Sequence, residues 1–184
     1  MSSSPIRSRP TITALMHRFW RNQRGVAAVQ FAFIAPLFFC LLFAIIEVSL
    51  IFFAGQTLET ATQDSARMIL TGQAQGGSYT QAMFKNDLCG RIVALFNCQS
   101  GIYIDVESAP VGTALTLPSP VDASNNFTAA NFKYNPGNAT DMVVVRVYYQ
   151  WPIFVSTLGF SVGNLANNMF LLNATAAFHN EPYS

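Results

Sequence analysis

Charged residues are scarce in this 184-residue chain, making up 10% of it against 51% for hydrophobic residues. Soluble domains usually carry about 25% charged residues, so part of the surface is not expected to face water. The length allows one domain and an anchor. Residues 1–25 hold five arginines and no acid, whereas the rest holds five cations and nine acids. A short basic leader before an acidic body does not resemble a nucleic-acid-binding domain, and we expect no nucleic-acid partner.

Residues and motifs typical of catalysis are also few. The chain has only two histidines, His17 and His179, and a long apolar segment separates them. We expect them to lie on opposite sides of a membrane, where they cannot share a metal ion or act together. Neither a Walker A loop nor an H-E-x-x-H helix occurs. The sequence therefore predicts no enzyme activity, no cofactor and no metal site.

The dominant feature is an apolar segment from Val26 to Gly55, interrupted only by Gln30, Glu47 and Ser49. About 20 helical residues cross the hydrocarbon core of a bilayer, and a cleaved secretory signal has an apolar core of only about 7–15 residues. We therefore predict a retained membrane span. The arginines before it predict a cytoplasmic N-terminus. Three regions are expected: a basic cytoplasmic leader at 1–25, a transmembrane helix at 26–55 and an extracytoplasmic domain at 56–184.

Glu47 is the costly residue of this segment, since a carboxylate near mid-bilayer costs on the order of 2–3 kcal/mol. Counting 20 residues from Val26 reaches Ile45, so one interpretation places Glu47 near the outer interface of the membrane. The other is that it pairs with a partner chain inside the membrane. Both interpretations stay open at this point.

Helical periodicity continues beyond Gly55. Small and apolar residues recur at spacings of three and four, as expected of a narrow packing seam: Ile51, Ala54, Leu58, Ala61, Ser65 and Met68. Gly72 and the pair Gly76-Gly77 end the pattern. We predict one helix from about Val26 to Leu70, whose outer half packs on the C-terminal domain.

The remaining segments predict a small α+β domain. A second helix, capped by Ser78 or Thr80 and ending by Asn97, would bury one face: Met83, Phe84, Leu88, Ile92 and Leu95. Strands are expected at 102–107, 142–151 and 169–178, with a long irregular excursion at 109–140 and a short helical or loop piece at 156–165. In the first strand Tyr103, Asp105 and Glu107 would point outward. Arg146 would lie on the outward face or pair with an acid. The predicted fold class is α+β, with a long N-terminal helix packed on a small antiparallel sheet.

Three cysteines remain to be placed. Cys89 falls in the predicted second helix and Cys98 just after its end. Outside the cytoplasm such a pair is oxidised by default, so we predict a disulfide between them, the alternative being two reduced core cysteines. Cys40 lies in the apolar segment as an apolar filler.

One motif at the start of the apolar segment points to a known family. Arg24-Gly25 precedes the run VAAVQFA, and Pro36 follows Phe31 by five residues. This resembles the TadE-like pseudopilins of the bacterial tight-adherence (Tad/Flp) system, whose N-termini read R-G-x-x-A-V-E-F-A-x-x-x-P before a long apolar helix. Further similar segments bring the resemblance to most of residues 21–182: QTLETA at 56–61, SAR at 65–67, TGQAQ at 71–75, VVVRVYY at 143–149 and ATAAFHNEP at 174–182.

The resemblance implies a pilin-like fold and a role in assembling Tad/Flp pili, which serve adhesion. An inner-membrane prepilin peptidase would cut the Gly25–Val26 bond, so that the mature chain begins at Val26. The implied location is the bacterial inner membrane, with the C-terminal domain in the periplasm. The implied partners are that membrane, the prepilin peptidase and other Tad pilus or pseudopilin subunits.

Gln30 departs from the family pattern, which has glutamate at the fifth mature position. That carboxylate is thought to pair with the N-terminal ammonium of a neighbouring subunit, whereas an amide offers a neutral hydrogen bond of about half the strength. The candidate assembly residues are Gln30, Phe31 and Glu47. An alternative function is an uncleaved bitopic adaptor of the Tad machinery. A third is a tethered ligand-binding or catalytic domain, which would need a pocket formed among Asp105, Asp141 and Arg146.

Overall fold

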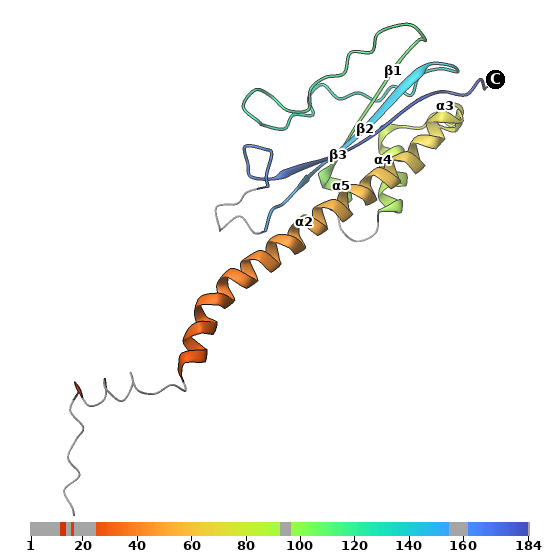
Figure 1. The fold of residues 1–184 in the computed structure, drawn as a ribbon. Helices are drawn as coiled ribbons and strands as arrows, with labels where there is room; N and C mark the ends of the chain where they lie inside the picture. Colours follow the sequence, from red (N-terminus) through yellow and green to blue (C-terminus); the bar gives the residue numbers. More distant parts are fainter. Residues whose placement is uncertain (1–11, 14–15, 17–24, 93–96, 155–161, 184) are drawn as a thin grey trace, which may run out of the picture. The chain divides into compact units, whose positions relative to one another are not determined.

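The structure is a computed structural model that describes residues 12–13, 16, 25–92, 97–154 and 162–183. The chain divides into two compact units, residues 1–43 and 44–184. Its elements, in chain order, are α2 (Val26–Leu70), α3 (Gln73–Gly76), α4 (Gln81–Arg91), α5 (Cys98–Gly101), β1 (Ile102–Ala109), β2 (Met142–Trp151) and β3 (Phe170–His179) (Figure 1). The predicted α+β class is confirmed, and the arrangement of a long apolar helix and a three-stranded antiparallel sheet is pilin-like.

Helix α2 has 45 residues, continues through Pro36 and has the bounds that periodicity predicted. The helix ends just before Gly72, which has a left-handed φ of 77°. The Thr71 N–H donates to the Arg67 carbonyl, and the Gly72 N–H donates to the Ile69 carbonyl. A larger residue at Gly72 would be strained at this φ, and its Cβ would collide with the ring of Tyr183.

The sheet has the order β1-β2-β3, and both pairs are antiparallel. β2 has the predicted bounds. β3 begins one residue later than predicted, and β1 runs two residues further. In the register, Arg146 at the middle of β2 lies opposite Asp105 on one side and Thr175 on the other. The predicted pairing of the last two strands is confirmed.

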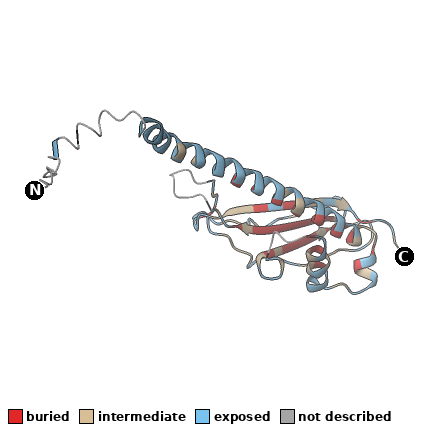
Figure 2. Cartoon of the chain, turned by 90° about the horizontal axis from the view of Figure 1, so that it is seen from below, coloured by how far each residue is buried: buried red, intermediate tan, exposed pale blue. Residues whose placement is uncertain are grey.

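The hydrophobic core lies between one face of the sheet and the outer half of α2, with α4 alongside (Figure 2). Five of the six predicted seam residues on α2 are buried. Met68 is only partly buried, and Ile69 is fully buried in its place. The prediction for Met68 was wrong because a straight helix with 3.6 residues per turn drifts by about 20° per heptad against a strict seven-residue repeat.

The second face of the sheet is covered by residues 110–141. The rings of Phe127 and Phe132 pack against Tyr148, with centroids 6.1 and 5.3 Å away. The same segment also contacts β1: the Val106 N–H donates a hydrogen bond to the Lys133 carbonyl. The predicted outward direction of Asp105 is right, but its expected exposure was wrong: Asp105 is 0% exposed because the excursion lies over it.

The second helix is shorter than predicted. Thr80 is its N-cap, and the Thr80 hydroxyl accepts a hydrogen bond from the Met83 N–H. Phe84 and Leu88 are fully buried, whereas Met83 is 44% exposed because it lies one residue, or about 100° of helix rotation, from Phe84. The helix ends at Arg91, not near Asn97. The predicted core residue at 95 and most of the predicted piece at 156–165 lie outside the described residues.

Candidate processing and assembly sites

The candidate cleavage junction lies where α2 begins. Gly25 is exposed, and Val26 is the first residue of the helix, with 50% of its surface exposed. A Cβ built on Gly25 meets no atom within 4 Å. Within the described residues, therefore, no part of the fold packs against the glycine before this bond.

The inner half of α2 is apolar and uncovered by its own chain. Every residue from 26 to 46 is exposed or partly exposed, including Phe31 and Phe33 at 68% and 80%. Only 17% of a strongly apolar 18-residue stretch of α2 is buried. The core helix of a soluble protein would be mostly buried. This helix is long and apolar enough to cross a membrane.

The two candidate assembly residues near the start of α2 share this exposure. Gln30 and Phe31 are both exposed, and they follow Val26 by about one helical turn. Neighbouring positions on a helix lie about 100° apart, so the two side chains leave the helix in different directions. Both are available to a partner molecule in the described structure.

Glu47 is buried in its own chain, with 7% of its surface exposed. Its Oε1 accepts a hydrogen bond from the Phe154 N–H at 2.5 Å, across 107 positions of sequence. Neither sequence interpretation of Glu47 included this contact. The signal was present in the spacing, since Glu47 precedes Ile51 by four residues and so continues the buried seam of α2.

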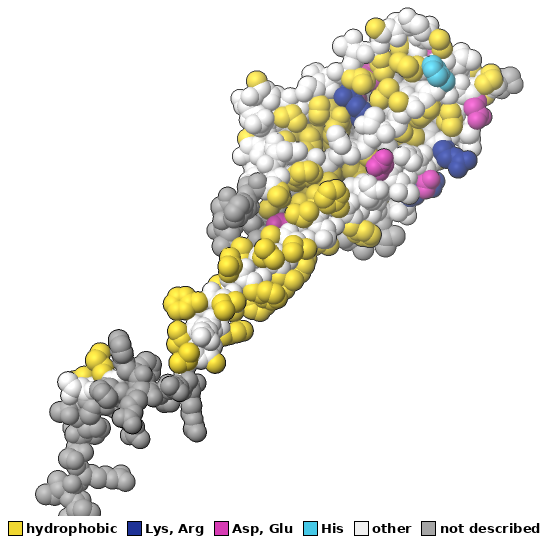
Figure 3. Space-filling view, viewed as in Figure 1, with side chains coloured by type: hydrophobic (Ala, Val, Ile, Leu, Met, Phe, Trp, Pro, Cys, Tyr) yellow, Lys and Arg dark blue, Asp and Glu magenta, His cyan; other side chains and the backbone are white. Residues whose placement is uncertain are grey.

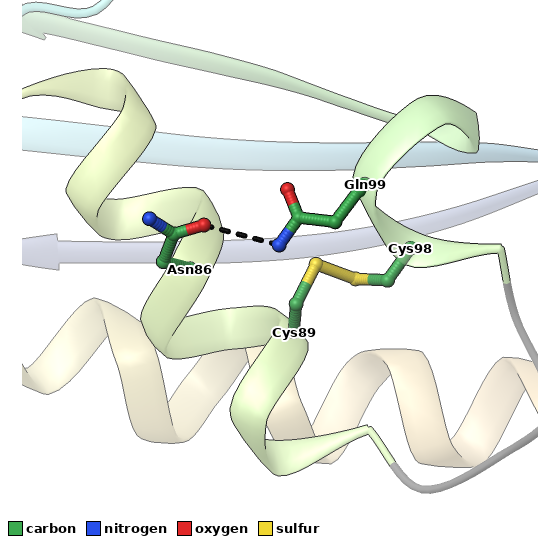
Figure 4. The surroundings of a disulfide bond; sticks show 4 residues. All are labelled: Asn86, Cys89, Cys98 and Gln99. Carbon is green, nitrogen blue, oxygen red and sulfur yellow. Dashed lines mark hydrogen bonds between the residues drawn. A yellow bond between two sulfur atoms is a disulfide. The ribbon is translucent and has the colours of Figure 1, made fainter.

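The predicted disulfide is present. It joins Cys89 near the end of α4 to Cys98 at the start of α5, with a Cα–Cα distance of 5.6 Å (Figure 4). Beside it, the Gln99 side-chain amide donates to Asn86 Oδ1 at 3.0 Å. These contacts hold α5, and with it the start of β1, against α4. Cys40 is a free cysteine.

Arg146 and Asp105 form a buried ion pair. Arg146 Nε and Nη2 lie 3.0 and 2.5 Å from Asp105 Oδ2, and Nη1 donates to the Pro118 carbonyl at 2.9 Å. Asp105 Oδ1 accepts from the Lys133 N–H at 2.9 Å. Through Pro118 and Lys133, the ion pair therefore links residues 110–141 to the sheet. Of the two sequence alternatives for Arg146, pairing with an acid is confirmed.

The three groups that a tethered binding site would need do not converge. Asp141 accepts a hydrogen bond from the Asn138 N–H at 2.7 Å and so stabilises a turn, while Asp105 and Arg146 bind each other. None of the three lines either of two open cavities of about 400 and 460 Å³, one lined by Lys85, Tyr103 and Phe132 and the other by Glu107, Pro118 and Lys133. Burial lowers the pKa of Lys85. Among the described residues, no group of three or more His, Cys, Asp or Glu side chains could hold a metal ion.

One run, GFSVG at 159–163, matches the G-x-S-x-G pattern of a serine nucleophile elbow. Such an elbow requires a strand, a sharp turn and then a helix. The serine lies outside the described residues, and the described residues 162–169 lead into β3 without forming a helix. The described part of this context does not match a nucleophile elbow.

These features define a class: α+β proteins with one N-terminal apolar helix, a small antiparallel sheet and a pilin-like arrangement. Within it, the sequence model of the TadE-like protein family matches residues 25–67, from the glycine before α2 to Arg67 in its last turn. The match confirms the predicted resemblance to this family over residues 25–67. Comparisons with curated proteins and with solved structures gave no match.

Proposed function

We propose that this protein is a membrane-anchored minor pseudopilin that assists the assembly of Tad/Flp pili and is processed by a prepilin peptidase after Gly25. The observation that carries this proposal is the position of the helix. α2 begins directly after Gly25, and its first 21 residues are apolar or small apart from Gln30 and are uncovered by the rest of the chain. Cleavage at that point would release a basic leader and leave the whole helix in the mature protein.

The proposed topology puts the arginine-rich leader in the cytoplasm, α2 across the inner membrane and the sheet domain in the periplasm. The disulfide supports this placement, since such bonds persist in the oxidising periplasm and are rare in the cytoplasm. The partners would be the membrane, the peptidase and other Tad subunits. The protein would act through packing and assembly and not as an enzyme.

The new N-terminal ammonium at Val26 would lie one helical turn from Gln30. An amide that accepts a hydrogen bond from an ammonium group of a neighbouring subunit offers less attraction than a carboxylate would. Gln30 would therefore contribute less to subunit docking than the glutamate of the family pattern. The exposed Phe31 would supply apolar contact in the same region.

The first test is the N-terminal residue of the protein purified from membranes of its native host. We expect the chain to begin at Val26. We also expect Gly25→Val to retain the leader, and because a Cβ at Gly25 meets no atom, its effect would report on the peptidase and not on folding. Gly76→Val is the matched control, since its Cβ also enters open space. A wild-type chain that begins at Met1 or Ser2 while the peptidase is active would reject the proposal.

The second candidate function is an uncleaved adaptor that holds other Tad components at the membrane, and Gln30 is the observation that favours it. Gln30→Glu separates the two. In a pseudopilin the carboxylate should increase recovery of the protein with sheared pili, because it restores a charge-assisted contact. In a fixed adaptor the substitution should leave the protein in the membrane fraction.

A further inference from the structure

One end of the sheet lies beside the part of α2 that contains Glu47. The Phe154 N–H, just after β2, donates to the Glu47 carboxylate. A Cβ on Gly55 would lie 3.8 Å from Leu172 near the start of β3. The opposite end of the sheet lies beside the end of α2, since the Glu181 N–H donates to the Leu70 carbonyl. The domain therefore has a basal end, near Glu47, and a distal end, near Leu70.

The basal end exposes large apolar side chains from both α2 and the segment after β2. We call this set the basal apolar surface: Val48, Leu50, Phe52, Phe53, Phe154 and Val162, which are 39–71% exposed. Figure 3 shows hydrophobic side chains gathered where α2 meets this end of the sheet. No Asp, Glu, Lys or Arg occurs between Arg146 and Glu181. An apolar, uncharged patch of this kind indicates an interaction surface.

The position of this surface along α2 indicates what covers it. A helix rises about 1.5 Å per residue, so Glu47 lies about 31 Å along the axis from Val26, close to the roughly 30 Å thickness of the hydrocarbon core. Exposed apolar side chains continue along α2 to Phe53, about 9 Å further. The basal apolar surface therefore lies at the depth of the outer membrane–water interface when α2 enters the bilayer at Val26.

We infer that the basal apolar surface rests in the interfacial layer of the outer leaflet, so that its partner is the lipid surface itself. This rests on the proposed membrane anchoring of α2, but not on cleavage or on pilus assembly. The Glu47–Phe154 hydrogen bond holds the segment after β2 against the anchor helix at this level. It also gives the carboxylate a donor where an unpaired charge would be costly. Two contacts with the membrane, the span and this surface, fix the tilt of the domain and hence the side that it offers to other subunits.

The test uses the full chain with Cys40→Ser, reconstituted into phosphatidylcholine vesicles, with bimane attached to one new cysteine. The disulfide is kept oxidised so that only the new thiol reacts. Phe154→Cys reports on the basal apolar surface, since its side chain is 70% exposed and its hydrogen bond uses only the backbone. Val111→Cys, 66% exposed beyond the distal end of β1, is the matched control, and Phe38→Cys reports on the span. Quenching is measured with spin-labelled lipid and with aqueous iodide.

We expect the label at position 154 to be quenched by spin-labelled lipid and to be several-fold less accessible to iodide than the label at position 111. Equal iodide accessibility at the two positions would overturn the inference. Protection from iodide without quenching by lipid would also overturn it, because a second protein copy would then cover the surface. If the label at position 38 escapes lipid quenching, the anchoring fails and this inference fails with it. Quenching at 38 but not at 154 refutes this inference alone and leaves the proposed function intact.

Discussion

Removing the guanidinium of Arg146 should destabilise the sheet domain far more than the same change at Arg91. Both arginines place Nε 3.0 Å from the Oδ2 of an aspartate, Asp105 for Arg146 and Asp87 for Arg91. The two pairs differ in burial. The side chains of Arg146 and Asp105 are 9% and 0% exposed, whereas those of Arg91 and Asp87 are 39% and 22% exposed. The comparison therefore tests how burial changes the cost of losing an arginine that is paired with an aspartate.

The expected magnitudes follow from what each substitution leaves behind. Arg146→Met strands the Asp105 carboxylate in the protein interior and removes the donor of the Pro118 carbonyl, and losing one partner of a buried pair costs about 3–5 kcal/mol. Arg91→Met removes an exposed pair spaced four residues apart on a helix, which is worth about 0.3–0.5 kcal/mol. Adding Asp105→Asn to Arg146→Met should recover part of the loss, since the amide oxygen still accepts from the Lys133 N–H and no charge is stranded.

Urea unfolding of the full chain in mild detergent, followed by tryptophan fluorescence, measures the free energy of unfolding for the four proteins. Trp151 is buried in the core and reports on it. The reasoning would be refuted if Arg146→Met and Arg91→Met lowered the free energy equally, or if the double variant were no more stable than Arg146→Met. Either result would mean that the excursion does not seal this pair from water.

Three further predictions use the same unfolding assay. Replacing both Cys89 and Cys98 by serine should lower the free energy of unfolding by about 2–3 kcal/mol, and dithiothreitol should reproduce the loss in the wild type but change nothing in the variant. Leu58→Ala, at a fully buried seam position, should cost about 2–5 kcal/mol, while Phe53→Ala at a 60% exposed position of the same helix should cost far less; similar losses would argue against packing of α2 on the sheet. Burial raises the pKa of Tyr134 from 10.0 to about 12. The neutral phenol is therefore favoured in the folded state. Its contribution to the free energy of unfolding is complete below about pH 10 and is lost as the pH rises through about 12. Between about pH 9 and about pH 11 the wild type should thus lose more stability than Tyr134→Phe, and parallel losses would contradict the assignment.

Much of the fold could be predicted because its signals are local and periodic. The bounds of α2 follow from an unbroken apolar run, a seam at spacings of three and four, and a glycine at the end. The strand at 142–151 follows from a run of β-branched and aromatic residues. The disulfide follows from two cysteines close together in a domain that the sequence predicted to lie outside the cytoplasm. The short motif around Gly25 predicts the candidate cleavage junction, and the structure adds that Gly25 and Val26 are exposed.

What the sequence did not determine depends on contacts between distant segments. The excursion at 110–141 has no periodicity of its own, so nothing in its sequence predicts that it covers the second face of the sheet and buries the Asp105–Arg146 pair. One partner of Glu47, Phe154, lies 107 positions away and donates through its backbone N–H, which no side-chain pattern can predict. Ile69 is buried in the core and the predicted Met68 is not, because over several turns the helix drifts away from a strict seven-residue repeat. Local sequence thus determined which segments are helix and which are strand. Tertiary packing alone decided which polar groups are buried and with which partners, because burial depends on the segments that fold over a residue and not on its neighbours in the chain.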